Sequence, residues 1–116
     1  MLPELFLARM QRLLGTEYEA FLAAYDRPRN VGLRLNPLKT DMPPALAQFG
    51  LTPVPWAENG FYYDVQSRPG LSPYHDAGLY YLQEPSAMAP AGLLDVQPGE
   101  RVLDLCAAPG GKTTQL

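Results

Sequence analysis

The most constraining feature of the sequence is a short apolar segment that runs directly into small residues and paired glycines. Residues 101–105 predict a buried strand, and residues 106–113, Cys-Ala-Ala-Pro-Gly-Gly-Lys-Thr, follow without a break. In open α/β sheets, ligands bind beyond the carboxyl end of a strand, where the chain turns into a helix. Glycines there let the backbone approach the ligand. We therefore expect a Rossmann-type ligand loop, with Asp104 equally suited to orient the loop amides or to contact the ligand.

Two kinds of ligand compete for this loop. Free N–H groups at a helix N-terminus suit either the methionine carboxylate of S-adenosylmethionine or a phosphate, and Lys112 adds a cation. A phosphate loop requires Gly, four residues and then Gly-Lys-Ser/Thr. Residues 111–113 supply the end of that pattern, but Cys106 stands where the first glycine belongs and Pro109 lacks an N–H. An ATP-binding fragment is therefore the less favoured alternative.

Apolar periodicity and turn residues predict an α+β organisation for the rest of the chain. Apolar spacing predicts a helix over residues 2–14, and residues 16–19 have the form of a capping box that begins a second helix. Residues 31–35 alternate like a strand, with Arg34 facing outward. Further elements are expected over residues 43–50 (helix, capped by Thr40 or Asp41), 51–56 and 60–65 (strands, the first at an edge because of Pro53 and Pro55), 73–78 (turn or short helix), 79–83 (strand) and 85–94 (helix).

These elements predict two domains. Residues 1–70 would form a helical hairpin and a small ferredoxin-like or RNA-recognition-motif-like sheet domain. Residues 71–116 would begin a Rossmann-like domain, with the boundary between residues 70 and 80.

Composition narrows the function classes. The 116 residues are 47% hydrophobic and 18% charged, as in a folded domain, and the apolar runs are too short to cross a bilayer. The single cysteine, Cys106, excludes an intrachain disulfide, so we expect a cytoplasmic protein. One histidine, His75, without a cluster of other ligands predicts no metal site. A net charge of −3 argues against a general nucleic-acid coat.

One local stretch departs from the acidic balance. Residues 27–39 carry four cations and no acid. Such a strip suits contact with phosphates. It is equally typical of a strand edge that charge keeps soluble.

Three segments together resemble the Sun/RsmB/RsmF family of RNA (cytosine-5) methyltransferases, and the RsmF-like branch most closely. Residues 102–113 resemble its cofactor motif DxCAAPGGKT, residues 80–88 its YxQEPSSM segment, and residues 32–40 its RVNTLKT strand. The resemblance implies RNA contacts by Arg34 and Lys39, because the matching strand lies in the RNA-facing domain of the family. It implies binding of S-adenosyl-L-methionine by Cys106, Ala107, Ala108, Pro109, Gly110, Gly111 and Lys112.

The resemblance also implies a reaction, the methylation of cytosine in ribosomal RNA. In the family a cysteine thiolate adds to carbon 6 of the base, which makes carbon 5 nucleophilic. Both catalytic cysteines belong to later motifs, so we expect no catalytic residue within residues 1–116 and no turnover by this stretch alone. Cys106 is expected to be a buried packing residue beside the cofactor. A noncatalytic RNA-binding module is the alternative function.

Overall fold

The computed structural model describes residues 2–39, 41 and 44–116, and its elements follow the expected order. They are α1 (Glu4–Leu14), η1 (Gly15–Glu17), α2 (Tyr18–Tyr25), β1 (Gly32–Leu35), η2 (Pro44–Phe49), β2 (Thr52–Pro53), β3 (Gly60–Tyr62), η3 (Val65–Ser67), η4 (Pro69–Leu71), α3 (Pro73–Asp76), β4 (Tyr80–Leu82), η5 (Pro85–Met88) and α4 (Ala89–Leu93), where η denotes a 3₁₀ helix. The cap predicted at Thr40 and the helix start predicted at residue 43 lie outside the described residues.

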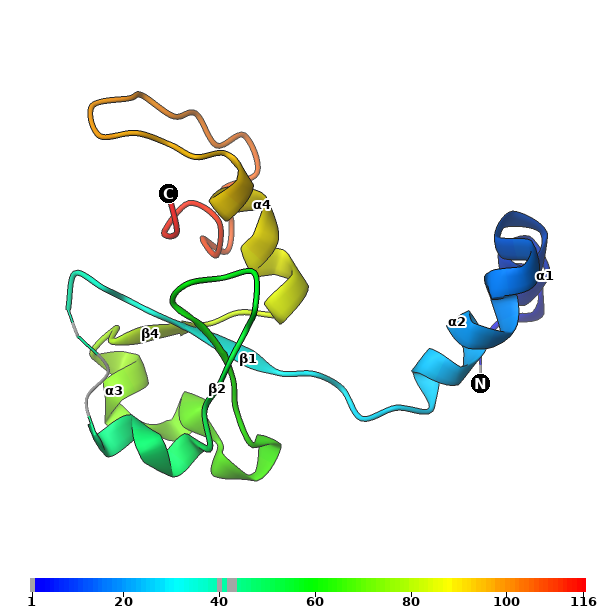
Figure 1. Cartoon of the computed structure of the whole chain (residues 1–116), viewed down its shortest axis with the longest axis horizontal. Coiled ribbons are helices and arrows are strands. Elements are labelled where there is room, and N and C mark those ends of the chain that lie inside the picture. The colour runs from blue at the N-terminus through cyan, green and yellow to red at the C-terminus, as the bar shows by residue number, and fades with distance from the viewer. Residues whose placement is uncertain (1, 40, 42–43) are drawn as a thin grey trace.

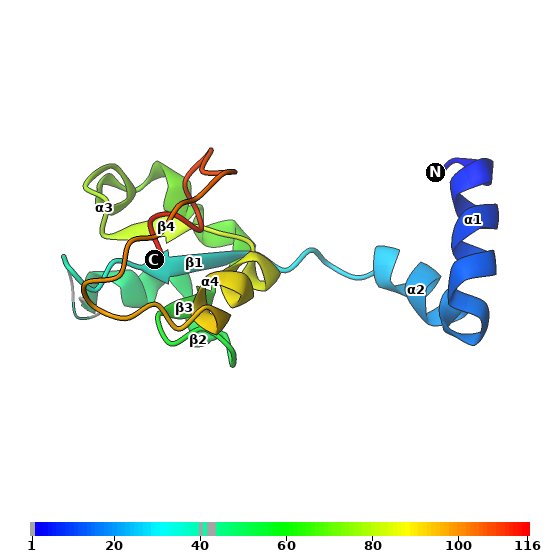
Figure 2. The same ribbon diagram turned by 90° about the horizontal axis from the view of Figure 1, so that it is seen from above.

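The two N-terminal helices form the expected hairpin, which stands apart from the sheet at the end of an extended connection (Figures 1 and 2). Phe6 of α1 packs on Phe21 of α2, with ring centroids 6.1 Å apart. The predicted capping box is wrong. An N-cap residue normally has an extended backbone, but η1 intervenes and Glu17, which precedes α2, is helical and makes no side-chain cap.

The four strands form one antiparallel sheet in the order β2-β3-β1-β4. Because β3 lies between β1 and β2, this is the split arrangement of ferredoxin-like folds, and the predicted sheet type is confirmed. β2 is at an edge, as its proline predicted. β4 pairs with β1, so residues beyond position 70 complete the sheet. The division into domains at residue 70 stays a prediction.

One face of the sheet packs on η2 and on the segment before β4. The core of this face consists of Leu33, Leu35, Leu46, Phe49 and Tyr80, all buried. The ring of Phe49 meets that of Tyr80 edge to face, at 5.8 Å between centroids. The buried hydroxyl of Tyr80 donates a hydrogen bond to the carbonyl of Pro69 at 2.7 Å, which satisfies its polar group and fixes η4.

The opposite face of the sheet is also covered, by η5, α4 and the last residues of the chain (Figure 1). Met88 of η5 is fully buried against two strand glycines. A Cβ on Gly60 would lie 2.6 Å from the sulfur of Met88, and one on Gly32 would lie 2.8 Å from the carbonyl oxygen of Gln83. The glycines therefore let η5 lie directly on β1 and β3.

Residues 101–105 form no strand, which corrects the sequence-based prediction. Leu103 is 80% exposed and Leu105 85% exposed. A buried parallel strand needs neighbours for its hydrogen bonds and layers on both faces. Within the described part of the chain, the only sheet is the one built from β1 to β4, and it does not include this segment.

Gly32→Ala is expected to lower the free energy of unfolding of the purified protein by about 1–3 kcal/mol, because the added methyl meets a backbone oxygen that cannot turn aside. Gly92→Ala in α4 is the matched control, since a Cβ there meets nothing within 4 Å and alanine favours a helix. Urea unfolding measures both variants. Equal stabilities would contradict the close packing of η5 on β1.

Candidate cofactor-binding loop

The loop at residues 106–112 folds back on β4 and encloses a pocket with it. This pocket has a volume of 240 Å³. One wall is the loop itself and the other consists of Tyr81, Leu82, Gln83, Glu84 and Ala87. The structure thus brings together every residue predicted to bind the cofactor. It also supplies a second wall, from residues 81–84 and Ala87, to which the sequence alone gave no role.

Close contact with β4 shapes the loop. The hydroxyl of Tyr81 donates to the carbonyl of Pro109 at 3.1 Å. A Cβ on Gly111 would lie 3.4 Å from the ring of Tyr81 and from the amide nitrogen of Gln83. Gly110 has a φ of 106°, a conformation that favours glycine. The turn therefore requires glycine at position 110, while Gly111 lies where even a methyl group would be in van der Waals contact with the sheet.

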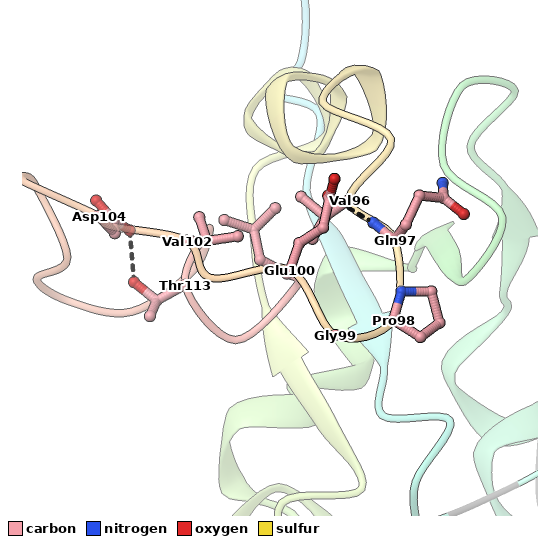
Figure 3. A pocket seen from close by; sticks show the side chains of 9 residues that line it. Val96, Gln97, Pro98, Gly99, Glu100, Val102, Asp104 and Thr113 are labelled. Atoms are coloured by element: carbon pink, nitrogen blue, oxygen red, sulfur yellow. Dashed lines mark hydrogen bonds between the residues drawn. The ribbon is translucent and has the colours of Figure 1, made fainter.

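Asp104 closes the base of the loop. Its carboxylate accepts a hydrogen bond from the N–H of Cys106 at 2.9 Å. It accepts a second from the hydroxyl of Thr113 at 2.6 Å (Figure 3). These bonds favour the ionised form, and the Thr113 hydroxyl makes the largest contribution to lowering the pKa of Asp104. Of the two roles expected for Asp104, orienting the loop is therefore the one that its contacts show.

Arg34 is 7% exposed, so the predicted outward orientation is wrong. The alternation itself is correct, because Arg34 lies on the face opposite Leu33 and Leu35. That face, however, is covered by the loop rather than by solvent. The guanidinium donates to the side-chain oxygen of Gln83 at 2.9 Å and to the carbonyl of Gly111 at 3.2 Å.

The other singled-out side chains lie on the surface. Lys39 is exposed, and its ammonium donates to the carbonyl of Ala77 at 2.7 Å. Cys106 is exposed, not buried as predicted, because no further layer of secondary structure covers residues 103–105, which precede it. His75 lies 3.9 Å from the carboxylate of Asp76. Among the described residues there is no group of three or more potential metal ligands and no helix long and apolar enough to cross a membrane.

A larger pocket of 500 Å³ is lined by residues 96–100, Val102, Asp104, Thr113 and Leu116 (Figure 3). Its charged lining residues are both acids, Glu100 and Asp104. Glu100 accepts a hydrogen bond from the N–H of Gln97 at 2.9 Å. A lining without a cation is unsuited to a carboxylate or phosphate, so the smaller pocket beside Lys112 is the better candidate site.

Known proteins resemble this chain in both sequence and structure. The family model described as the N-terminal domain of 16S rRNA methyltransferase RsmF matches residues 2–85. Ribosomal RNA small subunit methyltransferase F of Vibrio cholerae serotype O1 is 41% identical over an alignment that covers 99% of this chain and 27% of that protein.

Two crystal structures also match. PH0851 has a TM-score of 0.84 and 27% identity, covering 97% of this chain and 27% of its own. A methyltransferase homolog protein from Pyrococcus horikoshii has a TM-score of 0.77 and 34% identity. The match covers 98% of this chain and 39% of that protein's chain.

By its sheet domain and these similarities, the chain is related to methyltransferases. The chain belongs to the RsmF family, whose N-terminal domain it contains. The predicted resemblance to the RsmF-like branch is thereby confirmed. The chain spans about a quarter of the length of the curated relatives that it matches.

Titration of Asp104, followed by carboxyl carbon shifts in NMR spectra of the purified protein, should have its midpoint below that of an ordinary aspartate. Thr113→Val should move the midpoint upward, because it removes the largest cause of the lowered pKa. The hydrogen bonds to ionised Asp104 are fully present at pH values above the ordinary pKa of aspartate. They are lost as the pH falls through the lowered pKa of Asp104. Thr16→Val, the same exchange in η1, is the control. A midpoint that Thr113→Val leaves in place would contradict the assigned bond.

Proposed function

We propose that this chain is the N-terminal part of a cytoplasmic enzyme that transfers a methyl group from S-adenosyl-L-methionine to carbon 5 of cytosine in ribosomal RNA. The observation that carries the proposal is the loop at residues 106–112, which has the cofactor motif of the resembled family and lines a pocket against β4. We propose residues 1–70 as the RNA-facing part and residues 71–116 as the beginning of the methyltransferase domain.

The charges around the pocket fit the amino-acid end of S-adenosylmethionine. Ligand pockets usually measure about 300–1,000 Å³, so 240 Å³ suits part of the cofactor. Lys112 supplies a cation for the methionine carboxylate. Glu84 on the opposite wall supplies a carboxylate for the ammonium group, and a hydrogen bond from Ser86 is the first cause of its lowered pKa.

The same charges disfavour a triphosphate. Glu84 would repel its negative oxygens across the pocket. The hydroxyl of Thr113, which a phosphate loop uses to bind magnesium, is instead bonded to Asp104. Both observations count against the ATP-binding alternative.

We assign binding, and no chemical step, to the residues of this chain. When bound, the cofactor supplies an electrophilic methyl group. Residues 106–112 would hold its amino-acid end and exclude water from one side. Cys106 belongs to the loop, since its N–H is bonded to Asp104, and we do not propose it as the nucleophile.

The full-length protein is expected to transfer labelled methyl groups from S-adenosylmethionine to ribosomal RNA and to yield 5-methylcytidine on nuclease digestion. The 116-residue stretch alone should give no detectable transfer. Lys112→Ala in the full-length protein should weaken binding of S-adenosylhomocysteine about tenfold, as expected for a lost charged hydrogen bond. RNA binding without any methylation would leave the noncatalytic module as the function, and competition by ATP would favour a nucleotide site.

Lys39 is the exposed candidate for an RNA contact. Lys39→Ala should weaken ribosomal RNA binding by the full-length protein and reduce the slope of log affinity against log salt by about 1. Arg101→Ala is the control, because Arg101 is an exposed cation outside residues 1–70. An unchanged slope in titrations at several salt concentrations would remove Lys39 from the interface.

A further inference from the structure

We infer that Arg34 is a positioning residue for the cofactor loop, which it holds against the sheet in the shape that the ligand requires. This inference rests on the proposed function. It assigns to Arg34 a role other than the RNA contact that the basic strip of residues 27–39 suggested.

The guanidinium connects three separate segments. From β1, its Nε donates to Gln83, which follows β4. Its Nη2 donates to the carbonyl of Gly111 at 3.2 Å and to the hydroxyl of Thr114 at 2.9 Å. Its Nη1 lies 3.5 Å from the carbonyl oxygen of Thr114. The contacts with the loop bridge 77 and 80 positions of sequence, so a single side chain ties the turn to the sheet.

The bonded partners continue into the walls of the pocket. The hydroxyl of Thr114 also donates to the carbonyl of Gly110 at 2.8 Å, which closes the turn. The side-chain amide of Gln83 donates to the carbonyl of Ala87 at 3.1 Å. Gly110, Gln83 and Ala87 all line the 240 Å³ pocket, so the Arg34 network fixes both of its walls.

A packing role alone does not account for this residue. An apolar side chain would fill the covered face of the sheet without the cost of burying a charge. Within the described part of the chain, no carboxylate oxygen lies within 4.0 Å of the guanidinium, so Arg34 serves no ion pair there. Its planar array of donors reaches several acceptors at fixed angles, which the single ammonium of lysine cannot reproduce.

The test compares variants of the full-length protein by calorimetric titration with S-adenosylhomocysteine. Arg34→Lys and Thr114→Val should each weaken binding by about tenfold to a hundredfold, the usual range for charged hydrogen bonds. Thr114→Ser keeps the hydroxyl and should bind like the unaltered protein. Arg9→Lys, the same exchange on exposed α1, should also leave affinity unchanged. In turnover assays, KM for S-adenosylmethionine should rise in Arg34→Lys while KM for RNA stays constant.

Several outcomes would overturn the inference while leaving the proposed function intact. Equal cofactor affinity in the unaltered protein, Arg34→Lys and Thr114→Val would show that the network does not position the loop. Weaker RNA binding by Arg34→Lys with unchanged cofactor affinity would make Arg34 an RNA contact. If Arg34→Lys fails to fold, the Thr114→Val and Thr114→Ser pair decides, since they differ in one hydroxyl. Failure of the unaltered protein to bind S-adenosylhomocysteine would instead reject the proposed function.

Discussion

Burial of β1 on both faces is the constraint on which the rest of the sheet domain depends. Leu33 and Leu35 face one core, while Gly32 and Arg34 face η5 and the loop. This cover is possible because Gly32 has no side chain that would keep η5 away, and because backbone carbonyls of residues 111 and 114 accept hydrogen bonds from the guanidinium of Arg34. The strand thereby joins a structural core to the candidate ligand site.

This arrangement changes how a ferredoxin-like sheet is used. RNA-recognition motifs leave one sheet face open and stack bases on its aromatic side chains. In this protein the corresponding face is occupied by η5, α4 and residues 109–115, and Tyr81 donates to Pro109. The sheet supports the loop at residues 106–112, and this face is not open for stacked bases.

Local sequence patterns predicted most elements because their causes are local. Proline placed β2 at an edge, Gly15 ended α1, and alternation located β1. The prediction for residues 101–105 was wrong because a buried strand is stabilised by its neighbours, and periodicity cannot supply them. The capping box at Thr16 was wrong because a 3₁₀ turn continued the helix backbone past it.

The sequence by itself determined the family, the α+β class and which residues form the candidate loop, because motif residues and turn glycines act at fixed spacing along the chain. Tertiary structure alone decided which side chains meet the loop. Arg34, Gln83 and Thr114 are distant in sequence, and nothing in their spacing predicts their contact. Whether Arg34 met water or the loop depended on what covers its face of the sheet, and that is a property of the folded molecule.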